Sequence, residues 1–167
     1  MYFDHNRPRV DPVVCINILT LFYTYGRGIQ LRKSFEWVYQ VLLHRAYVDG
    51  TRYYTAEDFL FLLTRLLDCS DSPDLLDLKP LLKERVQERI GTGGDALALA
   101  MRILTCNFVG IRDEVDLQAL RQLQCEDGDW GVGWMYRYPG GIKIGNQGYT
   151  TAMAIKAIEV MAEPLSL

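Results

Sequence analysis

Histidine is rare in this sequence, and positive charge is not in excess. The sequence has only two histidines, His5 and His44, and its four cysteines lie far apart without a Cys-x-x-Cys pair. This pattern disfavours a zinc site and favours reduced thiols over disulfides. The formal net charge of −3 gives no electrostatic signature of nucleic-acid binding. No apolar run approaches the roughly 18–20 residues that span a bilayer, and no signal sequence is visible, so we expect a cytoplasmic protein without a transmembrane segment.

Familiar catalytic motifs are missing as well. There is no Gly-x-Ser-x-Gly element and no cysteine–histidine nucleophile pair. The glycine-rich run at 91–94 is not a P-loop, because the Lys-Ser/Thr pair is absent and no strand precedes it. The sequence therefore offers no signature of hydrolase or nucleotide chemistry.

Helical periodicity is what the sequence does contain. Its length predicts one domain over 1–167, with an irregular segment at 1–10. Two kinds of helix alternate, one apolar on nearly all sides and one amphipathic. We expect the first kind at 12–25, 56–67, 96–109 and from 149 onward, and the second at 31–46, 74–90 and 113–123. Thr55, with Asp58 three residues later, and Asp95 are the expected caps of the helices that follow them. Pro80 is expected to kink the pattern at 74–90, or to divide it into a short piece at 74–78 and a main piece from 80. This alternation predicts an all-α fold of about seven helices in two layers, with 134–138 as a brief extended piece.

A glycine-containing turn separates the last two helical patterns. The turn reads Gln124-Cys125-Glu126-Asp127-Gly128-Asp129-Trp130-Gly131. Asp127 and Gly128 favour a tight turn, because glycine tolerates positive φ and aspartate bonds its own backbone. Trp130 offers a large flat surface, and the amide of Gln124 can lie against that ring or bond the backbone of a neighbouring helix.

This pattern, Gln-x-x-Asp-Gly-x-Trp-Gly, resembles the QW motif of the terpenoid cyclase and protein prenyltransferase superfamily. As in that superfamily, a glycine-bearing loop and a helix with Thr-Thr-Ala in its first turns follow the motif. The chain resembles the C-terminal part of fungal or bacterial prenyltransferase-like toroid proteins. The resemblance implies a partial (α/α) toroid, in which Gln124, Asp127, Gly128 and Trp130 are structural. A partial ring exposes inner faces, so we expect self-association or a partner domain that completes it.

The resemblance also directs attention to acidic motifs. Class II cyclases of the superfamily carry Asp-x-Asp-Asp, whose middle aspartate donates a proton, and class I enzymes carry Asp-Asp-x-x-Asp for magnesium. Neither motif occurs here. The nearest candidate for a proton donor is Asp11 at the start of the first helix, where a helix cap is the competing interpretation. Asp127 and Asp129 are interpreted as turn formers rather than metal ligands, and neither a metal nor a cofactor is expected.

Two functional hypotheses follow. In the first, the chain is a terpenoid-cyclase-like domain of isomerase or lyase type that binds a prenyl or polycyclic terpenoid substrate in a biosynthetic pathway. An aromatic cavity would then stabilise cationic intermediates. In the second, the chain is a non-catalytic or truncated toroid domain that acts in partner binding or assembly. The residues expected to contact the isoprenoid are Asn17, Tyr53, Tyr54, Trp134, Tyr136 and Tyr138, with Tyr149 close by; Asn17 could instead bond a neighbouring backbone group.

Overall fold

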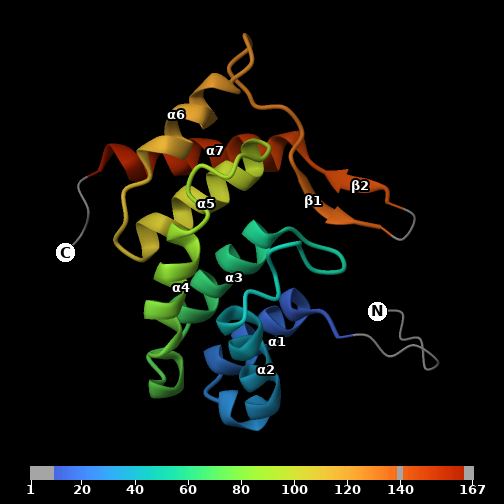
Figure 1. Ribbon diagram of the computed structural model, residues 1–167, viewed down its shortest axis with the longest axis vertical. Helices are drawn as coiled ribbons and strands as arrows, with labels where there is room; N and C mark the ends of the chain where they lie inside the picture. The colour runs from blue at the N-terminus through green and yellow to red at the C-terminus, as the bar shows by residue number, and fades with distance from the viewer. Residues whose placement is uncertain (1–9, 139–140, 164–167) are drawn as a thin grey trace.

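The computed structural model describes residues 10–138 and 141–163, and within them the chain is almost entirely helical (Figure 1). Seven α-helices, two short 3-10 helices and one β-hairpin follow one another along this part of the chain. The elements are α1 Pro12–Thr24, η1 Gly28–Leu31, α2 Arg32–Leu43, α3 Ala56–Asp68, η2 Pro73–Leu75, α4 Leu78–Gln87, α5 Ala96–Phe108, α6 Glu114–Gln122, β1 Trp134–Arg137, β2 Lys143–Gly145 and α7 Gln147–Ala162. The irregular segment expected at 1–10 lies, except for its last residue, outside the described part.

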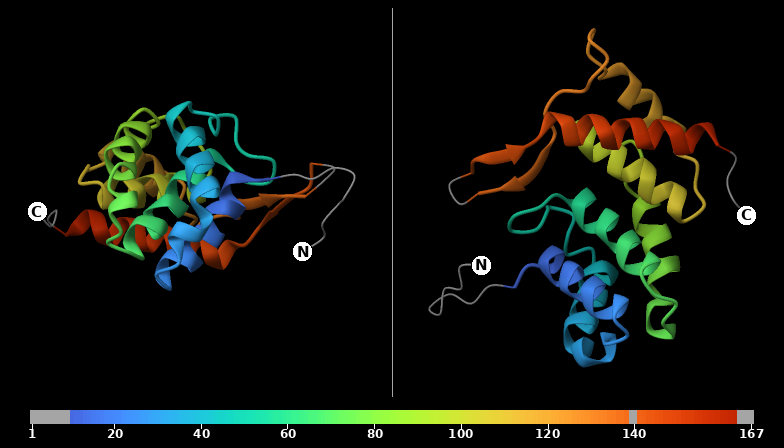
Figure 2. Two further views of the ribbon diagram at one scale, coloured as in Figure 1. Left: turned by 90° about the horizontal axis from the view of Figure 1, so that it is seen from below. Right: turned by 180° about the vertical axis from the view of Figure 1, so that it is seen from behind.

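The helices form two layers. Helices α1, α3, α5 and α7 lie side by side in one row, and each contacts the next. Helices α2, α4 and α6 form the second layer: α2 contacts α1, α4 contacts α3 and α5, and α6 contacts α5 and α7 (Figure 2). The N-termini of the row point toward the side from which the hairpin projects (Figure 1). The prediction of an all-α, partial toroid with alternating layers is therefore confirmed.

Each helix of the inner row begins at a polar cap. The side chain of Asp11 accepts a hydrogen bond from the Val13 backbone, and Thr55 forms a reciprocal capping box with Asp58. Such caps satisfy backbone N–H groups that have no partner inside the helix. The caps at α5 and α7 are Asp95 and Asn146. The caps predicted at positions 11, 55 and 95 are confirmed, whereas the last helix begins two residues earlier than expected, since Asn146 supplies its cap.

The helical pattern at 74–90 is divided in two. A 3-10 turn, Pro73–Leu75, precedes α4, and Pro80 is the third residue of α4. Proline is tolerated there because the first N–H groups of a helix have no partner inside it. The outcome agrees with the expected separation into a short first piece and a main helix.

A buried ion cluster joins three of the helices. Arg102 of α5 donates to Asp116 of α6 at 2.8 Å and to Glu57 of α3 at 3.0 Å. Arg89, just beyond α4, also pairs with Glu57. All of these side chains are largely buried, and because they are paired, their opposite charges compensate one another inside the protein. The cluster fixes the inner row against the outer layer.

The hairpin forms the only β-sheet of the described residues. Strand β1 confirms the extended piece expected at 134–138, and β2 pairs with it in antiparallel fashion. The partner strand was not anticipated, because 143–145 is only three residues long and ends in glycine. Its position is set by the chain on either side rather than by its own propensity.

Candidate functional site

Trp130 occupies the centre of the packing between α5, α6 and α7. Its ring is 1% exposed, and its indole N–H donates to the Leu120 carbonyl of α6 at 2.8 Å. The Trp130 backbone N–H donates to the hydroxyl of Thr151 in α7 at 3.2 Å. This one residue therefore ties the end of α6 to α7.

Gln124 bonds within its own loop. Its exposed amide donates to the Gly128 carbonyl at 2.8 Å. Of the two contacts considered for this amide, the bond to a neighbouring helix is therefore not the one formed. Gln124 and Trp130 nonetheless lie opposite each other, since their backbones form an isolated antiparallel bridge.

The turn at Asp127–Gly128 closes this loop. Gly128 has a φ of 91°, in the region that favours glycine, and its N–H donates to the Cys125 carbonyl at 3.0 Å. Ligand atoms of Cys125, Asp127 and Asp129 lie within 4.8 Å of one another. A hydrogen bond to Asp129 raises the pKa of the Cys125 thiol, and Gln147 donates to the Asp129 carboxylate. The hydrogen bonds from the Gly128 N–H to Cys125 and from Gln147 to Asp129 hold these side chains in a tight turn.

Four of the predicted aromatic residues meet beside the inner helices. Tyr53 stacks on Tyr136 with ring centroids 5.4 Å apart, and Tyr54 meets Tyr136 edge-on at 5.6 Å. Tyr138 contacts Tyr136 at 6.4 Å. The loop before α3 is held to the hairpin by a backbone bond from Arg137 to the Tyr53 carbonyl, 2.7 Å long. Residues more than 80 positions apart in the sequence thus form one aromatic cluster.

Trp134 does not join that aromatic cluster. Lys143 places its ammonium 5.0 Å from the centroid of the Trp134 ring, on the hairpin itself. Asn17 is also separate: its side chain is exposed on the same side of α1 as Ile18 and Leu21. No hydrogen bond from the Asn17 side chain occurs among residues 10–138 and 141–163, so the backbone-bonding interpretation finds no support.

Asp11 lies next to the aromatic cluster. It is 6% exposed, and its Oδ1 accepts the Val13 N–H at 2.9 Å. The other oxygen, Oδ2, is buried and has no hydrogen-bond partner within the described part of the chain. Burial raises the pKa of Tyr54, and the nearby charge of Asp11 raises it further. The helix-cap interpretation of Asp11 is therefore confirmed, and one carboxyl oxygen is left over.

A second carboxyl group, Asp58, was identified from the sequence only as part of a cap. It accepts from the backbone N–H and the hydroxyl of Thr55, at 2.9 and 2.7 Å. Burial raises its pKa to about 6 despite those bonds. Burial also raises the pKa of Tyr149, and the charge of Asp58 adds to that effect. The Thr55-x-x-Asp58 spacing signalled the cap, but no local signal could have shown the burial.

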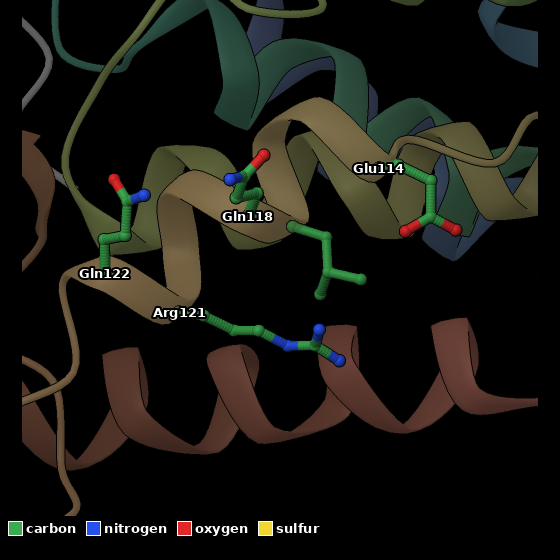
Figure 3. A pocket seen from close by; sticks show the side chains of 5 residues that line it. Glu114, Gln118, Arg121 and Gln122 are labelled. Carbon is green, nitrogen blue, oxygen red and sulfur yellow. The ribbon is translucent and has the colours of Figure 1, made fainter.

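Two surface hollows lie away from these residues. One, of about 510 Å³, is open and lies on α6, where Arg121 and Glu114 approach it from separate turns of the helix (Figure 3). Another, of about 260 Å³, lies beside η1 and α2 and includes Tyr23 and Asp74. Neither contains a residue predicted to contact substrate. We use the term acid–aromatic cluster for Asp11, Tyr53, Tyr54, Asp58, Tyr136 and Tyr149, a set that includes some of the predicted residues but also Asp58, which was expected only as part of a cap.

An alternating helical arc closed by a QW-type turn defines a protein of the terpenoid-cyclase toroid class. Comparison with known proteins agrees, because residues 1–25 match the family described as "Sesquiterpene cyclase astC-like C-terminal domain". Over 161 residues the chain is 50% identical to drimenol cyclase drtB of Aspergillus calidoustus. The chain is thus a relative of the terpenoid cyclases.

That similarity covers 94% of this chain but only 30% of the length of the Aspergillus protein. No solved structure matches the sequence. Among the helices of the described residues, none combines the length and apolar character needed to cross a membrane.

Proposed function

We propose that the chain forms part of the wall of a cavity in which a prenyl or polycyclic terpenoid substrate is cyclised. The observation that carries this proposal is the buried Oδ2 of Asp11, which has no hydrogen-bond partner among the described residues and belongs to a carboxylate whose charge raises the pKa of Tyr54. An acid beside aromatic ring faces is the equipment that proton-initiated cyclisation requires. The description of the matching family supports a substrate of sesquiterpene size.

The two oxygens of Asp11 suit different tasks in this chemistry. The Val13 N–H holds Oδ1 in place, which leaves Oδ2 to carry a proton. Transfer of that proton to an alkene breaks the O–H bond, forms a C–H bond and leaves a carbocation. A neighbouring double bond then attacks the cation and closes a ring. The reaction ends when a proton returns to the carboxylate, either from carbon to give an alkene or from a water molecule that has added to the cation to give an alcohol. The ring faces of Tyr53, Tyr54 and Tyr136 stabilise the cationic intermediates.

Turnover experiments test this proposal. The purified chain would be incubated with farnesyl diphosphate, geranylgeranyl diphosphate and epoxysqualene, with and without magnesium, and analysed for cyclised products. We expect product from at least one substrate and its loss in Asp11→Asn. Asp71→Asn, which changes an exposed acid in the loop between α3 and η2, is the matched control and retains activity. The proposal would be refuted if the wild type neither formed a cyclised product nor bound a prenyl substrate.

We also infer that this helical arc packs against further helices along α1. The outward side of α1 carries Ile18 and Leu21, which are 41% and 55% exposed, and Tyr25 follows at the end of the helix. Helices of an inner layer bury such side chains against a neighbour. A second copy or another domain would therefore complete this side of the arc.

A further inference from the structure

The hairpin has two chemically different faces. Tyr136 pairs with Ile144 and Arg137 pairs with Lys143, so the two pairs point to opposite sides. An irregularity between Trp134 and Tyr136 shifts the register by one residue. This β-bulge brings Trp134 to the side of Lys143, whose ammonium lies over its ring. One face is therefore aromatic and aliphatic. The other face, which we term the cationic face, consists of Trp134, Arg137 and Lys143.

The two cationic residues of this face, Arg137 and Lys143, lie directly opposite each other on the paired strands. The N–H of Arg137 donates to Tyr53, away from β2, so Arg137 and Lys143 form a pair without mutual backbone bonds. Side chains approach most closely in pairs of this type. Both are exposed, and like charges directly opposite each other are unfavourable unless an anion lies between them.

Acidic partners for these cations are missing nearby. Neither Arg137 nor Lys143 takes part in an ion pair among the residues that the structure describes. The sequence from Trp130 to Ile158 contains no aspartate or glutamate. The carboxylate of Asp95 lies at the base of the hairpin, but its two oxygens accept the backbone N–H groups of Ala98 and Trp134. The cationic face thus has positive charge that no acidic side chain among the described residues neutralises.

We propose that the cationic face binds the diphosphate group of a soluble ligand. A guanidinium forms paired hydrogen bonds with phosphate oxygens, and an ammonium adds a mobile point charge. The two positive charges of this cross-strand pair equal the charge of one small dianion, and they are too few and too localised to suit an extended charged surface. Identification of this anion as the diphosphate end of a prenyl substrate rests on the proposed function, whereas the anion site itself does not.

Calorimetric titration of the 167-residue chain with inorganic diphosphate tests the site. We expect saturable binding that weakens as salt is added, because screening acts on exposed charges. The double variant Arg137→Gln/Lys143→Gln should bind at least about tenfold more weakly, since two charge-assisted contacts are lost. Lys156→Gln removes one exposed cation from α7 and should change binding by less than about twofold. All variants alter exposed side chains, and circular dichroism would confirm that they fold.

Sedimentation with phosphatidylserine-containing vesicles distinguishes the source of the phosphate. The proposal is supported when diphosphate binds, the double variant loses it and vesicles do not retain the chain. It is overturned when the wild type does not bind diphosphate, or when the double variant binds equally well. It is also overturned when vesicles retain the wild type and diphosphate does not compete, because the face would then serve a membrane surface. Failure of the cyclisation assay leaves each of these results unchanged.

Discussion

At the residue scale, Trp130 contributes both area and a hydrogen bond to the core formed by α5, α6 and α7. Trp130→Ala should lower the free energy of unfolding by about 3–5 kcal/mol, because it leaves a cavity in this core and removes the bond from the indole N–H to the Leu120 carbonyl. Gln124→Ala should cost less than about 1 kcal/mol, since its exposed amide bonds only its own loop. Denaturant unfolding would measure both. Equal losses would contradict the separate roles assigned to the two residues.

Arg102 is a buried cation that compensates the charges of two buried carboxylates. Arg102→Met removes the cation between Glu57 and Asp116 and should cost about 3–5 kcal/mol, because these buried carboxylates lose their shared partner. Arg32→Met breaks the exposed pair with Glu36 and should cost less than about 1 kcal/mol. Urea denaturation of both variants tests this difference. Similar costs would show that the buried cluster adds little stability.

Asp58 makes stability depend on pH. Burial raises its pKa from 3.8 to about 6, so the folded state binds a proton more tightly than the unfolded chain. The resulting stabilisation is complete below about pH 4 and is lost as pH rises through about 6. Between pH 4 and 7 the wild type should lose on the order of 2–3 kcal/mol more stability than Asp58→Asn. Asp113 also has a pKa raised to about 6 by burial and is present in both proteins, so the difference isolates Asp58. Parallel curves would contradict the assignment.

Short-range signals explain which residue roles could be predicted. Asp11 and Thr55 are caps because their spacing from the following backbone is local. The meeting of Tyr53 with Tyr136 and the burial of Asp58 depend on contacts between segments far apart in the chain. The substrate-contact roles predicted for Asn17, Trp134 and the tyrosines remain predictions.

At the element scale, the hairpin is positioned by close backbone approaches. A Cβ added at Gly133 would lie 2.3 Å from the Leu97 Cβ and 3.0 Å from the Thr150 hydroxyl, so Gly133→Ala should cost about 1–3 kcal/mol. Gly131, two residues earlier, has open space around an added Cβ, and Gly131→Ala should change stability by less than about 1 kcal/mol. Thermal unfolding of this matched pair tests the packing. Equal effects would show that the loop adjusts freely.

The elements themselves were more predictable than their arrangement. The alternation of all-apolar and amphipathic patterns indicated both layers. A helix that is apolar on all sides is buried, whereas an amphipathic helix has one face toward solvent. The short strand β2 carries no comparable signal in the sequence, and its pairing with β1 is found only in the structure. The motif around Trp130 predicted a structural contact between neighbouring helices. It did not predict that the indole N–H would donate to a carbonyl of α6.

At the scale of the whole molecule, the arc has uncovered apolar surface along α1. Ile18 and Leu21 lie there together, beside the exposed Asn17. The chain spans 30% of the length of its Aspergillus relative, so it matches only part of a longer protein of that class. Exposed apolar stripes on a helix favour association through that helix.

We therefore expect the isolated chain to self-associate with rising concentration. Ile18→Glu/Leu21→Glu should shift it to monomers without loss of stability, because these side chains are already exposed. Leu76→Glu, which charges a solitary side chain that is 67% exposed between η2 and α4, should leave association unchanged. Light scattering across a concentration series measures the mass of each protein. A wild type that stays monomeric throughout would show that the α1 surface does not drive assembly, and loss of association in Leu76→Glu would place the contact elsewhere on the arc.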